Sequence, residues 1–137
     1  MRGLVNHVDL TVKDPVASRP FYEAVLGHMG YRVSDVHERG IDFDLLTPEG
    51  VFASVGLIRA SEAGAAHAHD RFSPGLHHLA WSAADRADVD DLYALLMRIG
   101  ATVLDAPTEY PQYGAGYYAV FFADPDGLKL EYVHWPK

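Results

Sequence analysis

Two stretches of this 137-residue chain, offset by 77 positions, follow one pattern of strand, turn and strand. IDFDLLTPEGVFASV at 41–55 and YAVFFADPDGLKLEY at 118–132 each carry Pro-x-Gly between two apolar runs. Such a turn between strand-like runs predicts a β-hairpin. A repeat of this length restricts the chain to a fold built from two similar halves.

The segments before the two hairpins match as well. HVDLTV at 7–12 and HLAWSA at 78–83 are strand-like runs led by histidine, and a helical pattern follows each of them. Asp14 and Asp85 stand where an N-terminal helix cap is expected. The order of strand, helix and three strands therefore occurs twice. This order predicts an α+β fold made of two βαβββ modules.

The strands are expected near 4–12, 31–37, 40–47, 50–58, 76–83, 102–105, 117–123 and 127–134. Residues 1–137 are interpreted as a single domain. Module one covers about 1–59 and module two about 76–137, and a linker rich in Ala, Gly and Ser spans about 60–75.

Composition excludes several classes of protein. Without cysteine, neither a disulfide framework nor a thiolate metal site is possible, so any metal must be bound by nitrogen and oxygen. Eleven Lys and Arg against nineteen Asp and Glu give a net charge of -8, with no basic cluster for nucleic acid. No run approaches the roughly 18 apolar residues of a membrane span. The N-terminus lacks a signal-peptide pattern, so we expect a cytoplasmic protein.

Strand alternation places three metal-competent side chains on faces turned away from the helices. His7 leads the first strand, His78 has the equivalent position in the second module, and Glu131 lies on the last strand. Two imidazoles and a carboxylate suffice for a divalent ion such as Zn, Fe(II), Mn, Ni or Co. Strand histidines are also ordinary core or surface residues, and this reading stays open. His77 is expected on the helix side, with a structural role and a ring nitrogen bonded to the backbone.

Several other side chains are candidates for catalysis. The insertion DAPTEYPQYGAG at 105–116 carries Glu109 and Tyr113, which could act as a base and an aromatic wall on a lid, or could decorate a surface loop. Asp9 is a candidate base or partner of a metal ligand, or a solvated carboxylate. His67 and His69 are interpreted as linker residues.

The chain resembles the vicinal oxygen chelate superfamily of glyoxalases, bleomycin-resistance proteins and extradiol dioxygenases. NHVDLTV, PFYEAVLGHMGYRV, GLHHLAWSA and YAVFFADPDGLKLEYV carry this resemblance over nearly the whole chain. It implies a glyoxalase-like fold, in which paired βαβββ units form a curled mixed sheet around a cleft, commonly completed in a homodimer. Family members use the glutamate of the closing Asp-Pro-Asp-Gly-x3-Glu pattern as a metal ligand. By position, the resemblance implies His7, His78 and Glu131 as the ligands.

Three departures from family patterns bear on the reaction. Ser54 stands where glyoxalase I-like enzymes have a fourth ligand, a glutamate, which argues against lactoylglutathione lyase activity. Asp9 replaces the threonine of fosfomycin-resistance proteins and would repel a phosphonate. Phe121 replaces the tyrosine of extradiol dioxygenases, which also need a histidine base that His67 or His69 could supply.

The leading hypothesis is a homodimeric metal-dependent enzyme that chelates adjacent oxygens of a small substrate, with isomerase, lyase or ring-opening chemistry. A base among Asp9, Glu109 and Tyr113 would move the proton. The first alternative is a binding protein that sequesters a drug or metabolite without turnover, since bleomycin-binding relatives lack the metal ligands but an acidic cleft suits a cationic drug. The second alternative is an inert descendant whose own side chains fill the cleft.

Overall fold

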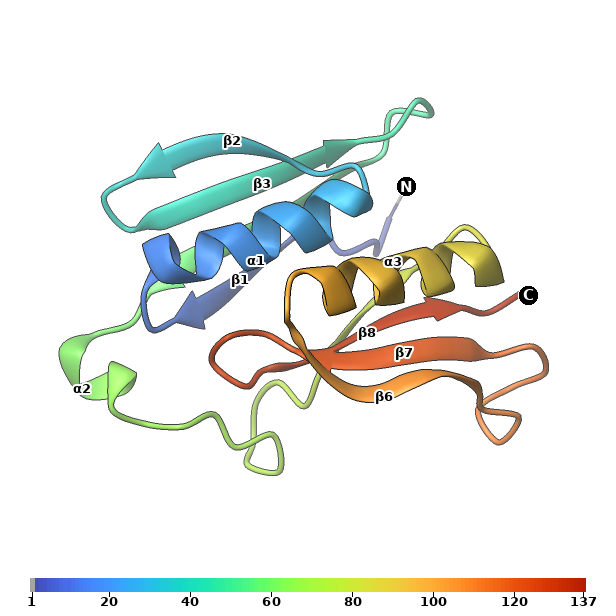
Figure 1. Cartoon of the computed structure of the whole chain (residues 1–137). Helices are drawn as coiled ribbons and strands as arrows, with labels where there is room; N and C mark the ends of the chain where they lie inside the picture. Colours follow the sequence, from blue (N-terminus) through green and yellow to red (C-terminus); the bar gives the residue numbers. More distant parts are fainter. Residues whose placement is uncertain (1) are drawn as a thin grey trace. The chain divides into compact units, whose positions relative to one another are not determined.

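The computed structural model describes residues 2–137 of the chain. By its contacts the chain divides into two compact units, one ending at His67 and the other beginning at Ala68. This boundary falls within the segment expected to link the two modules. Each unit contains one four-stranded sheet and one long helix (Figure 1).

The first unit has one parallel and two antiparallel strand pairs, in the sheet order β1-β4-β3-β2. Its elements are β1 (His7–Val12), α1 (Pro15–His28), β2 (Arg32–His37), β3 (Gly40–Leu46), β4 (Phe52–Arg59) and α2 (Glu62–Ala65). Leu10 and Val12 of β1 are buried, whereas His7 and Asp9 are exposed. The alternation of this strand is therefore as expected, with the polar set on the face away from the core.

The second unit repeats this topology in the order β5-β8-β7-β6, with β5 and β8 parallel. Its elements are β5 (Leu79–Ser82), α3 (Arg86–Arg98), β6 (Thr102–Glu109), β7 (Tyr118–Ala123) and β8 (Lys129–His134). The predicted caps are confirmed, since Asp14 accepts the Val16 N–H at 3.0 Å and Asp85 accepts the Asp88 N–H at 2.8 Å. The two mixed sheets with their helices confirm the predicted α+β class and the repeated βαβββ order.

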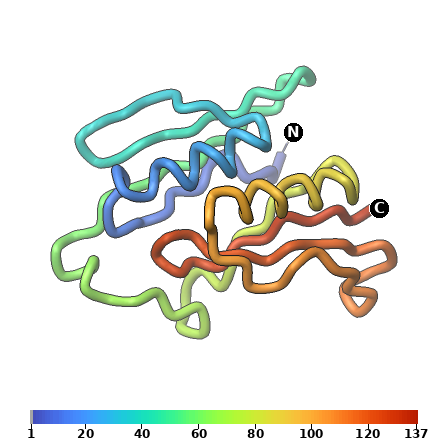
Figure 2. The backbone as a smooth tube through the Cα atoms, viewed as in Figure 1, coloured from blue at the N-terminus to red at the C-terminus, as the bar shows by residue number. Residues whose placement is uncertain are grey.

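Three strand boundaries differ from the prediction by three residues or more. β1 begins at His7 rather than near residue 4. β6 continues to Glu109, so the first part of the predicted insertion is strand and the loop proper lies between β6 and β7, where the tube turns orange in Figure 2. Pro107 is tolerated because β6 is an edge strand with irregular pairing between Asp105 and Thr108. β5 begins only at Leu79. His77 and His78 therefore precede the strand, and the rule of alternating faces does not govern them.

A polar link ties the start of α3 to the middle of β8. Tyr132 of β8 is 3% exposed, and its hydroxyl donates to Asp88 Oδ2 at 2.7 Å. The same oxygen accepts the backbone N–H of Ala84 at 2.8 Å. Burial, followed by the hydrogen bond to Asp88, raises the pKa of Tyr132 above its ordinary value. Because Glu131 is the preceding residue, this link also fixes the strand that carries it.

The variant Tyr132→Phe should reveal this link in the dependence of stability on pH. Below the ordinary pKa of 10.0, both states carry the phenolic proton, and the lost hydrogen bond should cost about 1 kcal/mol. Above that pH the unfolded phenol ionises first. The wild type should then lose stability more steeply than the variant, by up to about 1.4 kcal/mol per pH unit. Urea unfolding between neutral pH and the alkaline range measures both slopes, and parallel slopes would contradict the assignment.

Among residues 2–137, no helix combines the length and the hydrophobicity needed to cross a bilayer.

Candidate metal centre

Glu131 is a carboxylate inside the second unit. It is 2% exposed, between the buried Leu130 and Tyr132 on β8. A buried carboxylate is costly unless hydrogen bonds or opposite charges compensate it. Two side chains do so here: the Tyr117 hydroxyl donates to Oε1, and Nε2 of His78 lies 3.1 Å from Oε2. Each oxygen of the Glu131 carboxylate therefore has a polar side chain as its neighbour.

His78 reaches this carboxylate from the position just before β5, the strand that runs parallel to β8. β5 pairs Ala80 with Glu131, and His78 stands two residues earlier in the chain. Its side chain is 35% exposed, so one edge of the imidazole faces solvent while Nε2 faces the buried oxygen. The contact brings together two of the three side chains predicted as ligands, and their role as ligands stays a prediction.

The nitrogen and oxygen of this pair fit a divalent ion. Two ligands at right angles on bonds of about 2.1 Å lie about 3 Å apart. The 3.1 Å between His78 Nε2 and Glu131 Oε2 therefore suits neighbouring coordination positions after small adjustments. Because Tyr117 occupies Oε1, Oε2 is the oxygen that remains for a metal. An imidazole nitrogen and a carboxylate oxygen suit Zn, Fe(II), Mn, Ni and Co.

Tyr117 stays protonated in this position. Burial, followed by the hydrogen bond to Glu131 and the charge of that carboxylate, raises the pKa of the Tyr117 phenol. No sequence motif had singled out Tyr117, which lies one residue before β7.

His77 departs from its expected role. Its ring is exposed, and Nδ1 lies 2.8 Å from Nδ1 of His78 rather than against the backbone. Partial desolvation, followed by the charges of His78 and Arg71, lowers the pKa of His77, which favours the neutral ring. The expectation that neighbouring rings must serve opposite faces was wrong here, because the strand begins two residues later.

His7 belongs to the first unit and lies in a pocket of about 360 Å³ on the polar face of the first sheet. Nδ1 of His7 lies 3.0 Å from Asn6 Oδ1, and an amide oxygen only accepts, so this nitrogen carries the proton. Nε2 then offers a lone pair, as a metal ligand must. His7 as the third ligand beside His78 and Glu131 remains a prediction of the repeat. The pocket is lined by Asn6, His7, Asp9, His37, Arg39, Asp42, Phe52, Ser54 and Ile58.

Asp9 and Asp42 converge across Gly56 in this first-sheet pocket. The register aligns Gly56 with Asp9 of β1 on one side and with Asp42 of β3 on the other. A Cβ added at Gly56 would overlap Asp9 Oδ1 and lie 3.2 Å from Asp42 Oδ1. Because glycine has no side chain, the two carboxylates can occupy the space above Gly56 on this face of the sheet. Asp9, a predicted base, accordingly faces the pocket that also holds His7.

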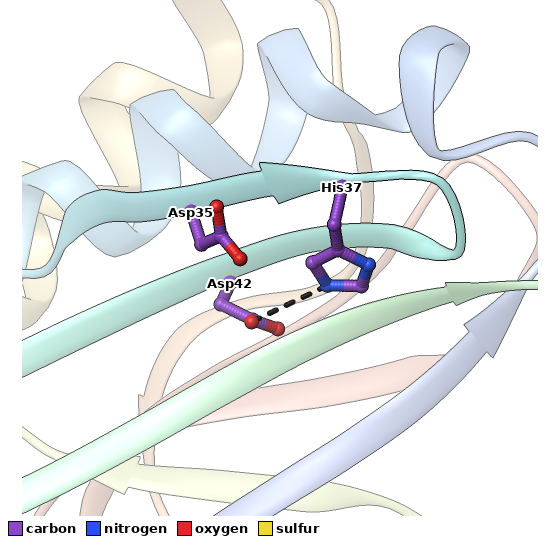
Figure 3. Close-up of side chains that lie close together, drawn as sticks. All are labelled: Asp35, His37 and Asp42. Atoms are coloured by element: carbon purple, nitrogen blue, oxygen red, sulfur yellow. Dashed lines mark ion pairs between the residues drawn. The ribbon is translucent and has the colours of Figure 1, made fainter.

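A second group of potential ligands, shown in Figure 3, lies on β2 and β3. The nearest ligand atoms of Asp35, His37 and Asp42 are within 4.8 Å of one another. The backbone N–H of Arg39 donates to His37 Nδ1 at 3.2 Å, so the neutral ring carries its proton on Nε2. That nitrogen faces Asp42 Oδ2 at 3.3 Å, where it donates. A metal on His37 Nε2 would therefore have to displace this proton, as it would at Nε2 of His78 beside Glu131.

Glu109 and Tyr113, the other predicted catalytic residues, lie in different surroundings. Glu109 ends β6 and is paired with Arg86 at 2.6 Å, and both side chains are largely exposed. Tyr113 is in the loop after β6, where its ring packs against Tyr110 and Tyr117 with centroids 5.5 and 5.3 Å away. The Tyr113 ring therefore contacts Tyr117, whose phenol donates to Glu131. The Glu109 carboxylate is instead paired with Arg86.

Aromatic side chains surround the pair of His78 and Glu131. Phe121 lies 6.3 Å from the His78 ring, centroid to centroid, and Tyr110 packs edge-on against Phe121 at 5.4 Å. On the other side Tyr117 contacts Trp135 at 5.2 Å. The surroundings of the pair are therefore apolar next to the buried carboxylate, which strengthens electrostatic interactions there.

A family model described as Glyoxalase/Bleomycin resistance protein/Dioxygenase superfamily matches residues 4–132. The chain belongs to this superfamily. The match spans both repeats, so the resemblance carried by the histidine-led strands and the closing glutamate motif is confirmed.

Similar proteins cover the chain almost completely. The uncharacterized protein YqjT of Bacillus subtilis (strain 168) is 33% identical over 129 residues, which are 94% of this chain and 97% of YqjT. A crystal structure from Bacillus halodurans, provisionally described as a glyoxalase, has a TM-score of 0.81 at 28% identity, covering 98% of this chain and 97% of that one. A lactoylglutathione lyase from Agrobacterium tumefaciens, 20% identical over 96% and 92% of the two chains, has a TM-score of 0.66 and shares the fold.

Proposed function

We propose that this member of the superfamily is a metal-dependent enzyme acting on two adjacent oxygens of a small molecule. The supporting observation is the 3.1 Å contact between His78 Nε2 and the oxygen of Glu131 that Tyr117 leaves available. A carboxylate that is 2% exposed is expensive to keep in a core without a function that needs it. His7 is the proposed third ligand, and the family fold supplies the prior expectation of a metal.

The roles of the individual residues follow from their surroundings. A divalent ion would supply a Lewis acid that stabilises negative charge developing on a substrate oxygen. Tyr117 keeps its proton and donates to Oε1 of Glu131, so Oε2 stays oriented for binding. Asp9 shares the first-sheet pocket with His7 and is the proposed base that takes a proton from the substrate carbon. Tyr113 and its aromatic neighbours would exclude water and bind the rest of the substrate.

Metal analysis is the first test of this proposal. Protein purified without chelators, or incubated with Zn, Mn, Ni, Co or Fe(II) and desalted, should retain about one ion per chain. His78→Ala should bind substantially less, whereas His67→Ala removes an exposed imidazole from α2's C-terminal side and should bind as the wild type does. The loaded and metal-free proteins are then compared on 2-oxoaldehydes with thiols, catechols and epoxides. Turnover that is independent of the ion would contradict the proposal.

A second candidate function is binding without turnover. The carboxylates of Asp9 and Asp42 converge above Gly56 in the first-sheet pocket, and two negative groups in about 360 Å³ suit a cationic ligand. Protein that stays metal-free after all incubations but binds cationic glycopeptide drugs in calorimetry would favour this candidate. Asp9→Asn should then weaken that binding.

A further inference from the structure

The structure points to His77 as a positioning residue for the metal ligand. We propose that the bond between its ring and the ring of His78 occupies Nδ1 of His78 and so assigns Nε2 to the metal. This inference rests on the proposed function, because it concerns a ligand of that metal centre. His77, which is not one of the proposed ligands, thereby gains a role of its own.

The geometry at His78 carries the inference. Its two ring nitrogens face different partners: Nδ1 is 2.8 Å from His77 Nδ1, and Nε2 is 3.1 Å from Glu131 Oε2. A neutral imidazole has one donor and one acceptor nitrogen, so the partner of one nitrogen decides the role of the other. With a metal on Nε2, Nδ1 of His78 carries the proton and donates to His77. Ligating histidines are commonly oriented through such a bond, which also makes the ligating nitrogen more basic.

His77 can fill this role because each ring nitrogen of an imidazole can donate or accept, depending on the tautomer. Without metal, Nε2–H of His78 donates to the carboxylate, and His77 donates its own Nδ1–H to His78. If a metal took Nε2 of His78, the proton on that nitrogen would pass to solvent and the proton of the bond would move to His78 Nδ1. Nδ1 of His77 would then accept, and the exposed ring of His77 would take up a proton on Nε2 from solvent. The bond between the two rings persists in both states. A phenyl ring in its place could neither donate nor accept.

The exposed His77 ring has an aromatic neighbour that is also exposed. Phe72 meets it edge-on at 5.6 Å between ring centroids. Asp70 fixes Phe72 in a tight turn, since its side chain accepts the Phe72 N–H at 3.0 Å and the Ser73 hydroxyl at 2.8 Å. His69 closes the same segment, because its Nε2 lies 2.9 Å from the carbonyl oxygen of Leu76. The residues before β5 thus form a hydrogen-bonded segment that leads up to the His77 ring.

His69 acquires a function of its own from this arrangement. The sequence left open that it could reach a substrate as a base, but the carbonyl of Leu76 accepts from its Nε2. Because His69 stands next to the turn at Asp70, it belongs to the same hydrogen-bonded segment. His69 therefore holds the backbone next to His77, and the contacts between side chains run from His77 through His78 to the carboxylate of Glu131.

Three variants separate positioning from packing. His77→Phe keeps a ring against Phe72 but removes both nitrogens. His77→Asn restores an amide group near the place of Nδ1, which can accept from His78. His67→Phe is the matched control, because it makes the same change at an exposed histidine that ends the first unit. Thermal unfolding of the metal-free proteins checks that all of them fold.

Zinc affinity is measured by competition with a chromophoric chelator. His77→Phe should bind Zn about 10- to 100-fold more weakly than the wild type, His77→Asn within about fivefold of it, and His67→Phe equally well. Nitrogen-15 NMR of labelled histidine should show Zn on Nε2 and a proton on Nδ1 of His78 in the wild type. In His77→Phe a second signal with the nitrogens exchanged should appear. Unchanged affinity and unchanged His78 signals in His77→Phe would overturn the inference.

The same spectra distinguish this failure from failure of the proposed function. If the wild type binds no metal, the proposed enzyme is refuted, but the metal-free spectra still test the bond between the rings. In that case, a changed Nδ1 resonance of His78 in His77→Phe, restored in His77→Asn, supports the positioning role of His77. An Nδ1 resonance that is the same in all variants refutes it.

Discussion

Glu131→Gln should lower the affinity for a divalent ion by at least about 100-fold. Zinc sites with four ligands bind with about 10–16 kcal/mol, which averages about 2.5–4 kcal/mol for each ligand. The amide keeps the shape of the side chain and can still accept from Tyr117, but its neutral oxygen is a poor ligand for a hard or borderline cation. The measurement is the same chelator competition, with elemental analysis of the desalted protein.

The stability of the metal-free variant makes the result interpretable. Glu131 is 2% exposed, so the amide removes a buried charge that costs free energy to desolvate. The metal-free variant should unfold within about 1 kcal/mol of the wild type. Glu109→Gln is the matched control, because Glu109 is exposed and paired with Arg86 on an edge strand, and it should bind the ion normally. Equal affinities of all three proteins would remove Glu131 from the ligand set.

Gly40→Ala should destabilise the first unit by about 3 kcal/mol or more. Gly40 is buried at the start of β3, where it pairs with Ile58 of β4. A Cβ at this position would overlap the carbonyl oxygen of Leu57, a backbone atom that cannot turn aside. The strands would have to separate where the hairpin after His37 begins. Urea unfolding followed by far-UV circular dichroism measures the loss.

Gly27→Ala is the control for Gly40→Ala. Gly27 is in α1, and an added Cβ would meet nothing within 4 Å. Alanine is the better helix former, so this variant should be stabilised by about 0.5–1 kcal/mol. Opposite signs for the same chemical change would show that the close approach of the strands, and not glycine content, decides the outcome. A small effect of Gly40→Ala would contradict the tight pairing of β3 and β4.

The repeat made the fold predictable because hairpin turns, caps and alternation are local properties. Asp14 and Asp85 cap their helices, and the pairing of β7 with β8 follows from the Pro-x-Gly turn. The length of β6 was not predictable in this way, since Pro107 signals a break and is accepted only at a sheet edge. Edge position is a property of the assembled sheet, which the local sequence does not contain.

Two residues of the candidate site were predictable, one from its strand and one from the histidine that the repeat places before the strand-like run. Glu131 follows from the strand pattern, and the contact with His78 follows from the parallel pairing of β5 and β8. Tyr117 was missed and His77 was assigned to the helix side because both lie one or two residues before a strand, where the alternation of faces does not direct the side chain. The space above Gly56 was equally invisible, because it depends on the register of β1, β4 and β3 together.

Glu131 and His78, whose facing atoms lie 3.1 Å apart, stand on backbone segments that differ in support. Glu131 is on β8, which has hydrogen-bonded neighbours on both sides, whereas His78 precedes β5, a strand at the sheet boundary. The backbone that carries Glu131 is consequently more rigid than the backbone that carries His78. Exchange between ions of different radius should be absorbed by displacement of the imidazole, with the carboxylate serving as the stationary reference point.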